Sequence, residues 1–414
     1  MTRLKDVAII NRVSLPDTTA PDQVLKYVDI GSVSGLGSFE PEELLFQEAP
    51  SRARRLVRSG DTIVSTVRTY LRAVAFIAHE ADEFVVSTGF ATLTPREGME
   101  PRFLYWLARG SDFIESVVSR SVGVSYPAIT ATELGSIEVS VPAQSQQQWV
   151  AAFLDSETER IDVLIREQEG LIASLLERRA SELDRWVEHG GGSELVGVAS
   201  PWIDAVPESW SFMPLKRCVA RVMVGIVINP SAYYEEDGVP VLRGLNIRPG
   251  RVSSEDLVYM SDASNELHRK STLCTGDVVV VRTGAAGSAA VVPDWAVGGN
   301  AVDLLIVRPG ERLVPAFLEH LLNSRLVQQQ VLYGSVGALQ SHFNTSALAN
   351  VMVVVPPVAE QQRVLDHLAP ALGRYDELIA EAGRQIALLR EHRQALITAA
   401  VTADSMDSIG WRDA

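Results

Sequence analysis

Cysteine is scarce in this sequence of 414 residues, which contains only Cys218 and Cys274, far apart in the chain. Two unclustered thiols exclude a disulfide framework and a cysteine-rich zinc site. The seven histidines are scattered without the spacing of metal ligands. No apolar run reaches the roughly 18 residues of a membrane span, and residues 1–11 lack the apolar core of a secretory signal. We therefore expect a cytoplasmic protein that holds no metal.

Positive charge is also in deficit, because the formal net charge is −15. Residues 1–140, 141–190, 191–355 and 356–414 are each net acidic. A protein that binds nucleic acid by itself usually carries a basic surface, since phosphate neutralisation supplies much of its affinity. Any affinity for DNA must therefore come from local basic clusters or from a partner subunit.

Catalytic motifs are missing as well. The sequence has no phosphate loop of the form Gly-x-x-x-x-Gly-Lys-Ser/Thr. Asn229-Pro230-Ser231 only approaches the Asn/Asp-Pro-Pro-aromatic motif of an adenine methylase, and the glycines of residues 31–37 form no clear cofactor loop. The chain is not expected to be an enzyme or to bind a cofactor.

The strongest positive signal is an internal duplication. Residues 101–179 match the chain itself without a gap at an offset of 214, the separation of Pro101 from Pro315. Three repeated elements carry the match: Ser121-Val122-Gly123 with Ser335-Val336-Gly337, Gln147-Gln148 with Gln361-Gln362, and, further upstream, Gly60-Asp61 with Gly276-Asp277. The duplication predicts an α/β globule of about 140 residues followed by a helix, used twice.

A heptad pattern follows the globule in each copy. In the second copy the apolar seam at 3,4 spacing consists of Leu365, Leu368, Leu372, Tyr375, Ile379, Ala382, Ile386, Leu389, Arg393, Leu396 and Ala400, and residues 151–186 repeat it more weakly in the same register. Pro370 and Gly373 are expected to interrupt the second helix early, leaving a segment from about 371 to 402. Such a segment would span roughly 48 Å. Antiparallel pairing of the two helices would place one globule at either end of a rod, whereas the alternative is that each helix merely covers its own globule.

Within the globules, residues 62–64 and 278–281 are expected to be buried strands, and residues 101–109 and 315–323 helices that begin with proline. Polar and basic side chains next to these elements are candidates for contacts with phosphates and base edges. In the first half they are Arg52, Arg54, Arg55, Arg58, Arg68, Ser125 and Tyr126. In the second half they are Arg243, Asn246, Arg248, Arg251, Arg269, Lys270, Arg282, Gln340, Ser341, His342 and Asn344. The alternatives are a solvated charged face for the basic clusters and a plain hairpin for the glycine turn that follows Arg282.

The ordered set of motifs resembles the specificity subunit of type I restriction–modification systems. It comprises Gly276-Asp277 before a strand and Arg282-Thr283-Gly284, then Ser335-Val336-Gly337-Ala338, Val355-Pro356-Pro357 with Gln361-Gln362, and the helix ending Arg393-Gln394-Ala395-Leu396-Ile397. The first copy repeats Val141-Pro142 and Gln147-Gln148 but lacks the Arg-Thr-Gly turn and the lead-in that Trp202 to Trp210 resembles.

The resemblance implies an α/β fold with two duplicated target-recognition domains separated by two long antiparallel coiled-coil helices. The expected divisions are domain 1 at 1–142, the central spacer helix at 143–189, domain 2 with its linker at 190–356, and the C-terminal spacer helix and tail at 357–414. Each domain would read one half of a bipartite, asymmetric site in double-stranded DNA. The helices would set the spacer and dock two methyltransferase subunits. S-adenosylmethionine and ATP would bind in the methyltransferase and restriction–translocase subunits.

Two other functions fit parts of the sequence. A coiled-coil adaptor that binds only proteins would explain the acidity and the helices, but not why the duplicated halves diverge at polar loop positions. A self-contained methyltransferase fusion would need the catalytic motifs that are missing.

Overall fold

The structure, a computed structural model, describes residues 1–78, 84–192, 194–227, 230–335 and 343–402. The chain divides into two compact units, each with one globule and parts of both long helices. Unit 1 consists of 1–169 with the segment from 383 onward, and unit 2 consists of 170–382.

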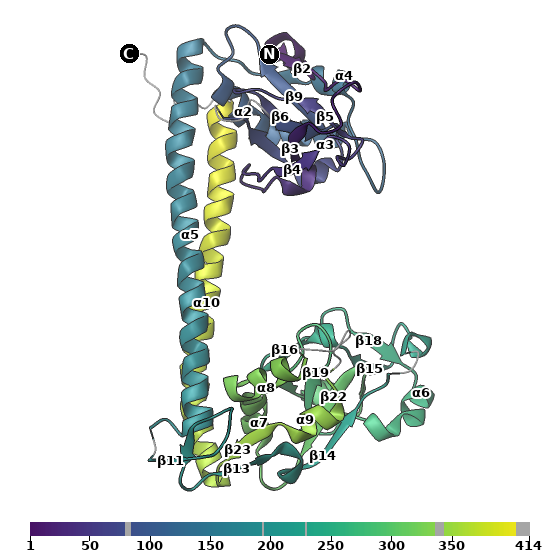
Figure 1. The fold of residues 1–414 in the computed structure, drawn as a ribbon, viewed down its shortest axis with the longest axis vertical. Coiled ribbons are helices and arrows are strands. Elements are labelled where there is room, and N and C mark those ends of the chain that lie inside the picture. Colours follow the sequence, from purple (N-terminus) through teal and green to yellow (C-terminus); the bar gives the residue numbers. More distant parts are fainter. Residues whose placement is uncertain (79–83, 193, 228–229, 336–342, 403–414) are drawn as a thin grey trace. The chain divides into compact units, whose positions relative to one another are not determined.

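Two four-stranded sheets form the globule of unit 1 (Figure 1). The first is antiparallel, with the order β2 (Ala8–Ile10), β9 (Phe90–Pro95), β6 (Thr62–Ser65), β7 (Val74–Phe76). The second has the order β4 (Glu42–Leu45), β3 (Val24–Val28), β8 (Phe84–Ser87), β5 (Ala53–Leu56), and β3 runs parallel to β8. A short pair joins β1 (Thr2–Arg3) to β10 (Glu138–Val139), and the helices are α1 (Leu4–Val7), α2 (Pro101–Arg109), α3 (Ser111–Ser119) and α4 (Ala131–Gly135). The first sheet and the buried face of α2 share one apolar core, in which Leu93, Phe103 and Leu104 are fully buried.

Unit 2 repeats this plan. Its antiparallel sheet has the order β14 (Val219–Val224), β22 (Leu304–Pro309), β19 (Val278–Val281), β20 (Ala289–Val291). Its second sheet has the order β18 (Val258–Met260), β15 (Val239–Leu242), β21 (Asn300–Ala301), again with one parallel pair. The remaining pairs are β11 (Leu195–Gly197) with β12 (Ala205–Pro207), β13 (Ser211–Pro214) with β23 (Met352–Val355), and β16 (Ile247–Arg248) with β17 (Arg251–Val252). The helices are α6 (Asp262–Leu267), α7 (Pro315–Asn323), α8 (Arg325–Ser335) and α9 (Thr345–Asn350).

The predicted duplication is confirmed by element bounds. α2 and α7 are both nine residues long, both begin with proline, and stand at the offset of 214 found in the sequence. β9 and β22 keep the same offset, and the predicted strands at 62–64 and 278–281 are the central strands β6 and β19. One α/β fold therefore occurs twice in the chain.

The two long helices are α5 (Gln144–His189) and α10 (Val358–Val401). In each unit a segment of α5 lies alongside a segment of α10 (Figure 1). Arg393 binds Asp162 and Arg390 binds Glu169 in unit 1, so residue numbers rise along one helix as they fall along the other. Unit 2 shows the same trend in Arg179–Asp376 and Glu182–His367. The pairing is antiparallel, as the resemblance implied.

The expected interruption of the second helix was wrong, because α10 continues through Pro370 and Gly373. Proline removes one backbone donor and usually bends or ends a helix. Pro370 lies on the exposed side, where water can satisfy the carbonyl group left without a partner, while Leu368 and Leu372 beside it are buried. Packing on the buried side holds the helix together across the proline.

The end of each long helix packs against the globule of the other sequence copy. In unit 1 the backbone N–H of Ser111, at the start of α3, donates to Thr398 Oγ1 of α10 over 3.1 Å. In unit 2 the equivalent N–H of Arg325, at the start of α8, donates to Asp184 Oδ1 of α5 over 2.9 Å. Because these N–H groups have no partner inside their own helices, the contacts satisfy them and anchor the helix ends.

Candidate nucleic-acid interface

In each globule a buried glutamine holds the start of a globule helix against the start of a long helix. Gln147 accepts a bond from the N–H of Glu100 over 2.8 Å and donates to the carbonyl oxygens of Gly98 and Pro142. Gln361 makes the equivalent three bonds to Val314, Arg312 and Pro356. Each amide ties the start of α2 or α7 to the start of a long helix, so the repeated Gln-Gln motif is structural at its first position.

The repeated Gly-Asp motif is structural too. Asp61 accepts from the N–H of Arg58 and from the Thr94 hydroxyl, and burial raises its pKa although both bonds lower it. Asp277 accepts from the N–H of Cys274 and pairs with Arg308 over 2.7 Å. Both carboxylates close the turn that leads into the central strand and hold the neighbouring strand. They position the loops at the far end of β6 and β19.

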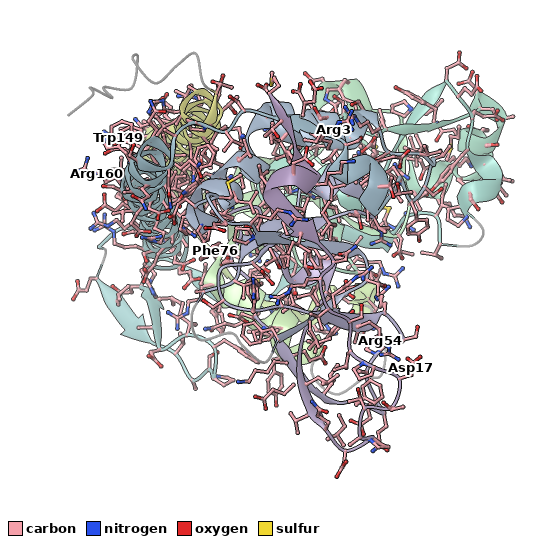
Figure 2. All side chains as sticks on the ribbon, turned by 90° about the horizontal axis from the view of Figure 1, so that it is seen from above. Arg3, Asp17, Arg54, Phe76, Trp149 and Arg160 are labelled. Atoms are coloured by element: carbon pink, nitrogen blue, oxygen red, sulfur yellow. The ribbon has the colours of Figure 1, made fainter. Side chains whose placement is uncertain are left out.

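Acidic neighbours pair with three of the four arginines around β5. Arg52 lies 3.0 Å from Asp29, Arg54 lies 3.6 Å from Asp17, and Arg58 lies 3.8 Å from Asp61. Figure 2 shows Arg54 and Asp17 side by side, and the Arg54 guanidinium also lies over the Phe46 ring. Arg55 donates to the Ser14 hydroxyl. These pairings reduce the positive charge that this strand presents, although Arg52 and Arg58 remain more than half exposed.

Arg68 and Tyr126 lie together in unit 1, and Ser125, the chain neighbour of Tyr126, is exposed. The Arg68 guanidinium lies 4.8 Å from the centre of the Tyr126 ring, and the Arg68 N–H donates to the carbonyl oxygen of Pro127. Thr69 and Ser121 share a hydroxyl hydrogen bond of 2.9 Å. These contacts join the loop of residues 66–73 to the loop of residues 121–128, and we call the joined loops the paired-loop surface.

Arg282 takes the matching position of unit 2, just after the central strand. It binds Asp303 over 2.7 Å and donates to the carbonyl oxygen of Phe343, and only 16% of its side chain is exposed. Gly287 N–H donates to the carbonyl oxygen of Val281 across this turn, as in a hairpin. Asn344 is exposed and accepts from the N–H of Ala347 at the start of α9. Gln340, Ser341 and His342 lie outside the described residues.

The other candidates of unit 2 are separate from this turn along the chain. Arg248 and Arg251 are exposed on the β16–β17 hairpin. Asn246 is fully buried; its amide donates to the carbonyl oxygen of Glu255 and accepts from the N–H of Arg243. The expectation that Asn246 contacts DNA therefore does not fit its place, because both ends of the amide are used to fold the loop.

Arg243 is half-buried and donates to the carbonyl oxygen of Asp256, so it also serves this loop. Arg269 and Lys270 are exposed in the short helical turn Arg269–Ser271, and Arg269 pairs with Glu266 over 3.1 Å. Of these candidates, Arg248, Arg251, Arg269 and Lys270 are exposed enough to reach a phosphate.

Comparison with known proteins places this arrangement. The type I restriction enzyme StySPI specificity subunit of Salmonella potsdam is 23% identical over 227 residues, 50% of this chain and 47% of that protein. The MjaIX specificity subunit of Methanocaldococcus jannaschii is 21% identical over 81% of this chain and 76% of its own length. A solved structure described as the basis of complex assembly and conformational transition of the type I R-M system superimposes with a TM-score of 0.74 at 24% identity, covering 97% of each chain. The chain is similar to the specificity subunits of type I restriction systems.

No family model matches the chain. The chain spans about half the length of the StySPI and EcoKI relatives that it matches. The structural likeness shows that the fold of two α/β domains joined by long helices is that of the compared type I structure.

Sequence reasoning missed several exposed side chains of the paired-loop surface. Tyr70, Arg72 and Val124 are all exposed, and Val124 is wholly so. Arg68 and Arg72 both have a φ of 53°, in the left-handed region that is costly for residues other than glycine. No local sequence signal marks such a conformation, because neither arginine stands beside a glycine or an asparagine.

Within the described residues, no group of three or more His, Cys, Asp or Glu side chains could hold a metal ion. Among the helices that the structure describes, none combines the length and apolar character needed to cross a membrane. Cys218 is buried and Cys274 is exposed, and both are free thiols.

Proposed function

We propose that this chain is the non-catalytic DNA-recognition subunit of a type I restriction–modification complex. Each globule reads one half of a bipartite, asymmetric site in double-stranded DNA. The paired long helices fix the unread spacer and dock two methyltransferase subunits. S-adenosylmethionine and ATP are bound by the methyltransferase and restriction–translocase partners.

One observation carries the proposal. The two globules share the hydrogen bonds that hold their sheets and helices together, and they differ in the loops that these elements support. The glutamines Gln147 and Gln361 make the same three bonds, and the carboxylates Asp61 and Asp277 close the same turn. Beyond the central strand, however, unit 1 has the helical turn Thr69–Leu71, whereas unit 2 has a glycine hairpin. A duplicated frame with unlike polar loops is what two readers of different half-sites require.

In unit 1 we assign base reading to the paired-loop surface. Arginine presents a planar donor pair that suits guanine O6 and N7, and hydroxyl groups bond to either kind of base edge. Arg68, Arg72 and Ser125 supply these groups, and the exposed rings of Tyr70 and Tyr126 supply apolar contacts. In unit 2 the matching assignment goes to the turn after Arg282 and to Asn344, together with Gln340, Ser341 and His342. Arg282 acts there as a positioning residue.

Phosphate contacts are assigned to the basic side chains outside these loops. They are Arg52, Arg54, Arg55 and Arg58 in unit 1, and Arg248, Arg251, Arg269 and Lys270 in unit 2, whereas Arg243 holds its own loop through the carbonyl oxygen of Asp256. The acidic partners of Arg52, Arg54 and Arg58 compete with phosphate, so we expect smaller contributions from these three. We also propose that the divisions 1–142, 143–189, 190–356 and 357–414 describe how the sequence is organised, although each compact unit combines parts of both long helices.

The experiment is methylome sequencing of the host with and without this gene. We expect one bipartite, adenine-methylated motif to disappear on deletion. Re-expression of an Arg68→Ala, Tyr126→Ala double variant should relax or abolish recognition of one half of the motif and leave the other half unchanged. Lys5→Ala, an exposed basic residue of unit 1 outside the paired-loop surface, is the matched control. A motif that survives deletion of the gene would refute the function, and a double variant that reads both halves normally would refute the site.

A further inference from the structure

A short hairpin follows the second sheet's strand β3 or β15 at the same place in each unit. Residues 33–39 form it in unit 1, where Val33 and Phe39 bridge its two arms. Residues 247–252 form it in unit 2 as the β16–β17 pair. Each hairpin begins one short helical turn after its strand. We call these two segments the edge hairpins.

Each edge hairpin carries a glycine of positive φ that lies against the same two elements. Gly37 approaches the carbonyl oxygen of Val74, the first residue of edge strand β7, so closely that a Cβ would collide with it. Gly250 donates its N–H to the carbonyl oxygen of Ala289, the first residue of edge strand β20. On the helix side both glycines face the fifth residue of α2 or α7. The edge hairpins are therefore equivalent parts of the two globules.

The positive charge of the two edge hairpins lies in different places. In unit 2 Arg248 and Arg251 are exposed on the hairpin itself. The hairpin of unit 1 contains no charged side chain, but Arg109 of α2 contacts it from the interior. The Arg109 guanidinium donates to the carbonyl oxygen of Leu36 and, over 2.6 Å, to that of Gly35. A cation therefore belongs to each hairpin, on the surface in unit 2 and only 6% exposed in unit 1.

Arg109 is a buried cation without an acidic partner. It also donates to the Tyr105 hydroxyl over 2.7 Å, and none of the ion pairs among the described residues includes it. Burial lowers the pKa of its guanidinium, and the positive charge of Arg393 lowers it further. The nearby carboxylate of Asp162 pairs with Arg393 instead. Because a buried charge is costly unless an opposite charge is close, an anion at the hairpin would be stabilised by Arg109.

Hydrogen bonds lead from Arg109 to the exposed tip of the hairpin. The two peptide units whose carbonyl oxygens bind Arg109 donate their N–H groups to Ser34. Gly37 N–H donates to the Ser34 carbonyl oxygen over 2.9 Å, and Leu36 N–H donates to the Ser34 hydroxyl over 3.3 Å. The Ser34 and Ser38 hydroxyls share a bond of 2.7 Å, and both residues are exposed. Hydrogen bonds in such a chain polarise one another, so the hydroxyl end favours a negatively charged ligand.

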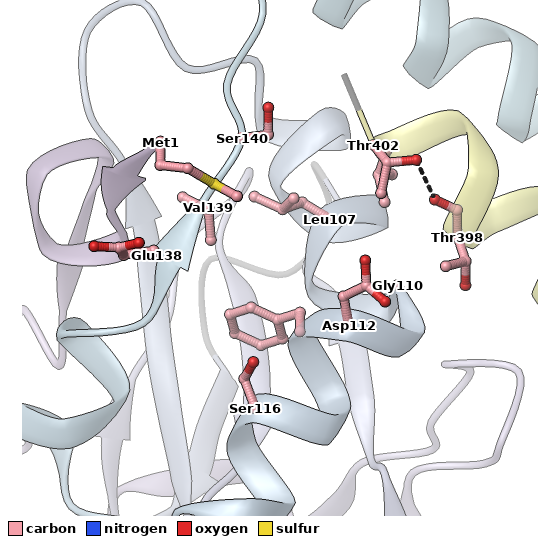
Figure 3. A pocket seen from close by; sticks show the side chains of 12 residues that line it. Met1, Leu107, Gly110, Asp112, Ser116, Glu138, Val139, Ser140, Thr398 and Thr402 are labelled. Carbon is pink, nitrogen blue, oxygen red and sulfur yellow. Dashed lines mark hydrogen bonds between the residues drawn. The ribbon is translucent and has the colours of Figure 1, made fainter. Parts of the chain in front are cut away.

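The end of α10 holds the backbone of Arg109 in place. Gln394 donates its side-chain amide to the carbonyl oxygen of Arg109 over 3.0 Å, and Ser111 N–H donates to Thr398. Figure 3 shows this junction, where Thr398 of α10 and Gly110 of the α2–α3 turn line one pocket. With its backbone anchored on one side, Arg109 holds its guanidinium against the hairpin on the other.

We propose that the edge hairpin of unit 1 binds a phosphate of the DNA backbone. The Ser34 and Ser38 hydroxyls donate to the phosphate, and Arg109 is the positioning residue that supplies the charge behind them. The hairpin is thus the counterpart of the one that carries Arg248 and Arg251 in unit 2. The inference rests on the proposed function and adds a contact that the basic clusters of the sequence do not mark.

Duplex binding by the assembly of this chain with its methyltransferase partner tests the proposal. Gly35 has open space around it and lies outside the left-handed region, so Gly35→Asp places a carboxylate at the tip without strain. We expect Gly35→Asp to weaken binding of the target duplex by about tenfold or more and to reduce the salt slope by about 0.9, the value for one phosphate. Thr132→Asp, which adds the same charge at an exposed position of α4, should change neither quantity.

Two substitutions of Arg109 test its role as the source of charge. Arg109→Gln removes the charge and should reduce affinity and salt slope as Gly35→Asp does, whereas Arg109→Lys keeps the charge and should restore most of both. A residue that only supports the fold would leave the salt slope of the folded assembly unchanged in either variant.

The parent assembly separates the two levels of the argument. If it prefers its target to a scrambled duplex and Gly35→Asp behaves as Thr132→Asp does, the hairpin contact is refuted and the proposed function stands. If the parent assembly shows no preference for any duplex, the proposed function fails and this inference fails with it.

Discussion

Single buried amides hold together the start of each globule and the start of each long helix. Gln361 is fully buried and satisfies two carbonyl groups and one N–H, so its removal leaves one buried and two partly buried backbone groups without this partner. Its neighbour Gln362 is exposed and donates to the Asp366 carboxylate over 2.8 Å. The repeated Gln-Gln pair therefore combines one structural residue with one that lies at the surface.

We expect Gln361→Ala to lower the free energy of unfolding by about 2–4 kcal/mol, because each unsatisfied buried group costs roughly 1–3 kcal/mol. Gln362→Ala should change it by less than about 0.5 kcal/mol. Urea unfolding followed by circular dichroism measures both variants. A similar, small effect of the two substitutions would contradict the structural role of Gln361.

A buried carboxylate at the end of α5 makes stability depend on pH. Burial raises the pKa of Glu188 to about 7, although the N–H of Leu326, which donates to Glu188 Oε1 over 2.6 Å, lowers it. Because the pKa in the folded state exceeds the ordinary value of 4.5, the stabilising contribution is fully present below pH 4.5 and is lost as the pH rises through about 7.

Glu188→Gln mimics the neutral acid and keeps an oxygen that can accept from Leu326. We expect the variant to match the parent near pH 4.5 and to be more stable by about 1–3 kcal/mol at pH 8. Glu177→Gln, at an exposed position on the same helix, should show no such trend. Denaturant midpoints measured from pH 4.5 to pH 8 decide the matter, and a stability difference that stays constant with pH would count against it.

At the scale of the helices, one ion pair occurs twice with the partners exchanged. Asp162 of α5 binds Arg393 of α10, and at the offset of 214 Asp376 of α10 binds Arg179 of α5. The first pair is buried, with side chains 7% and 14% exposed, whereas Asp376 in the second is 58% exposed. Chemically identical pairs in different surroundings separate the effect of burial from that of charge.

Double-mutant cycles to alanine should give a coupling energy of about 1–3 kcal/mol for Asp162 with Arg393, because little water screens this pair. The cycle for Arg179 with Asp376 should give less than about 1 kcal/mol. Unfolding free energies of the six variants provide both numbers. Equal coupling energies would show that burial does not govern the strength of these pairs.

The elements were largely predictable from the sequence, and the site was less so. Three features were predictable because they rest on local or periodic patterns of residues: the duplication, the proline starts of α2 and α7, and the heptad seam. The continuity of α10 through Pro370 was not predictable, because it depends on which side of the helix faces solvent. The assignment of Asn246 to DNA contact did not fit for a similar reason, since no local sequence pattern distinguishes a buried loop amide from one that faces a ligand.

For the whole molecule, the acidity is the feature that a DNA-reading role must explain. The net charge is −15, and acidic partners occupy several of the exposed arginines. Every phosphate neutralised in a complex contributes about −0.9 to the slope of log affinity against log salt concentration. A chain with this net negative charge should make few such contacts alone.

If the proposed function holds, we expect the isolated chain to bind its target duplex at least about a hundredfold more weakly than the assembly with methyltransferase subunits. Its salt slope should be smaller by several units, because the partners would supply further phosphate contacts. Fluorescence anisotropy across a range of salt concentrations measures both quantities. A scrambled duplex is the control for sequence preference. If the isolated chain matched the affinity and salt slope of the assembly, its own surface would have to supply the cationic contacts. The inference from its net charge that partner subunits supply them would then be wrong.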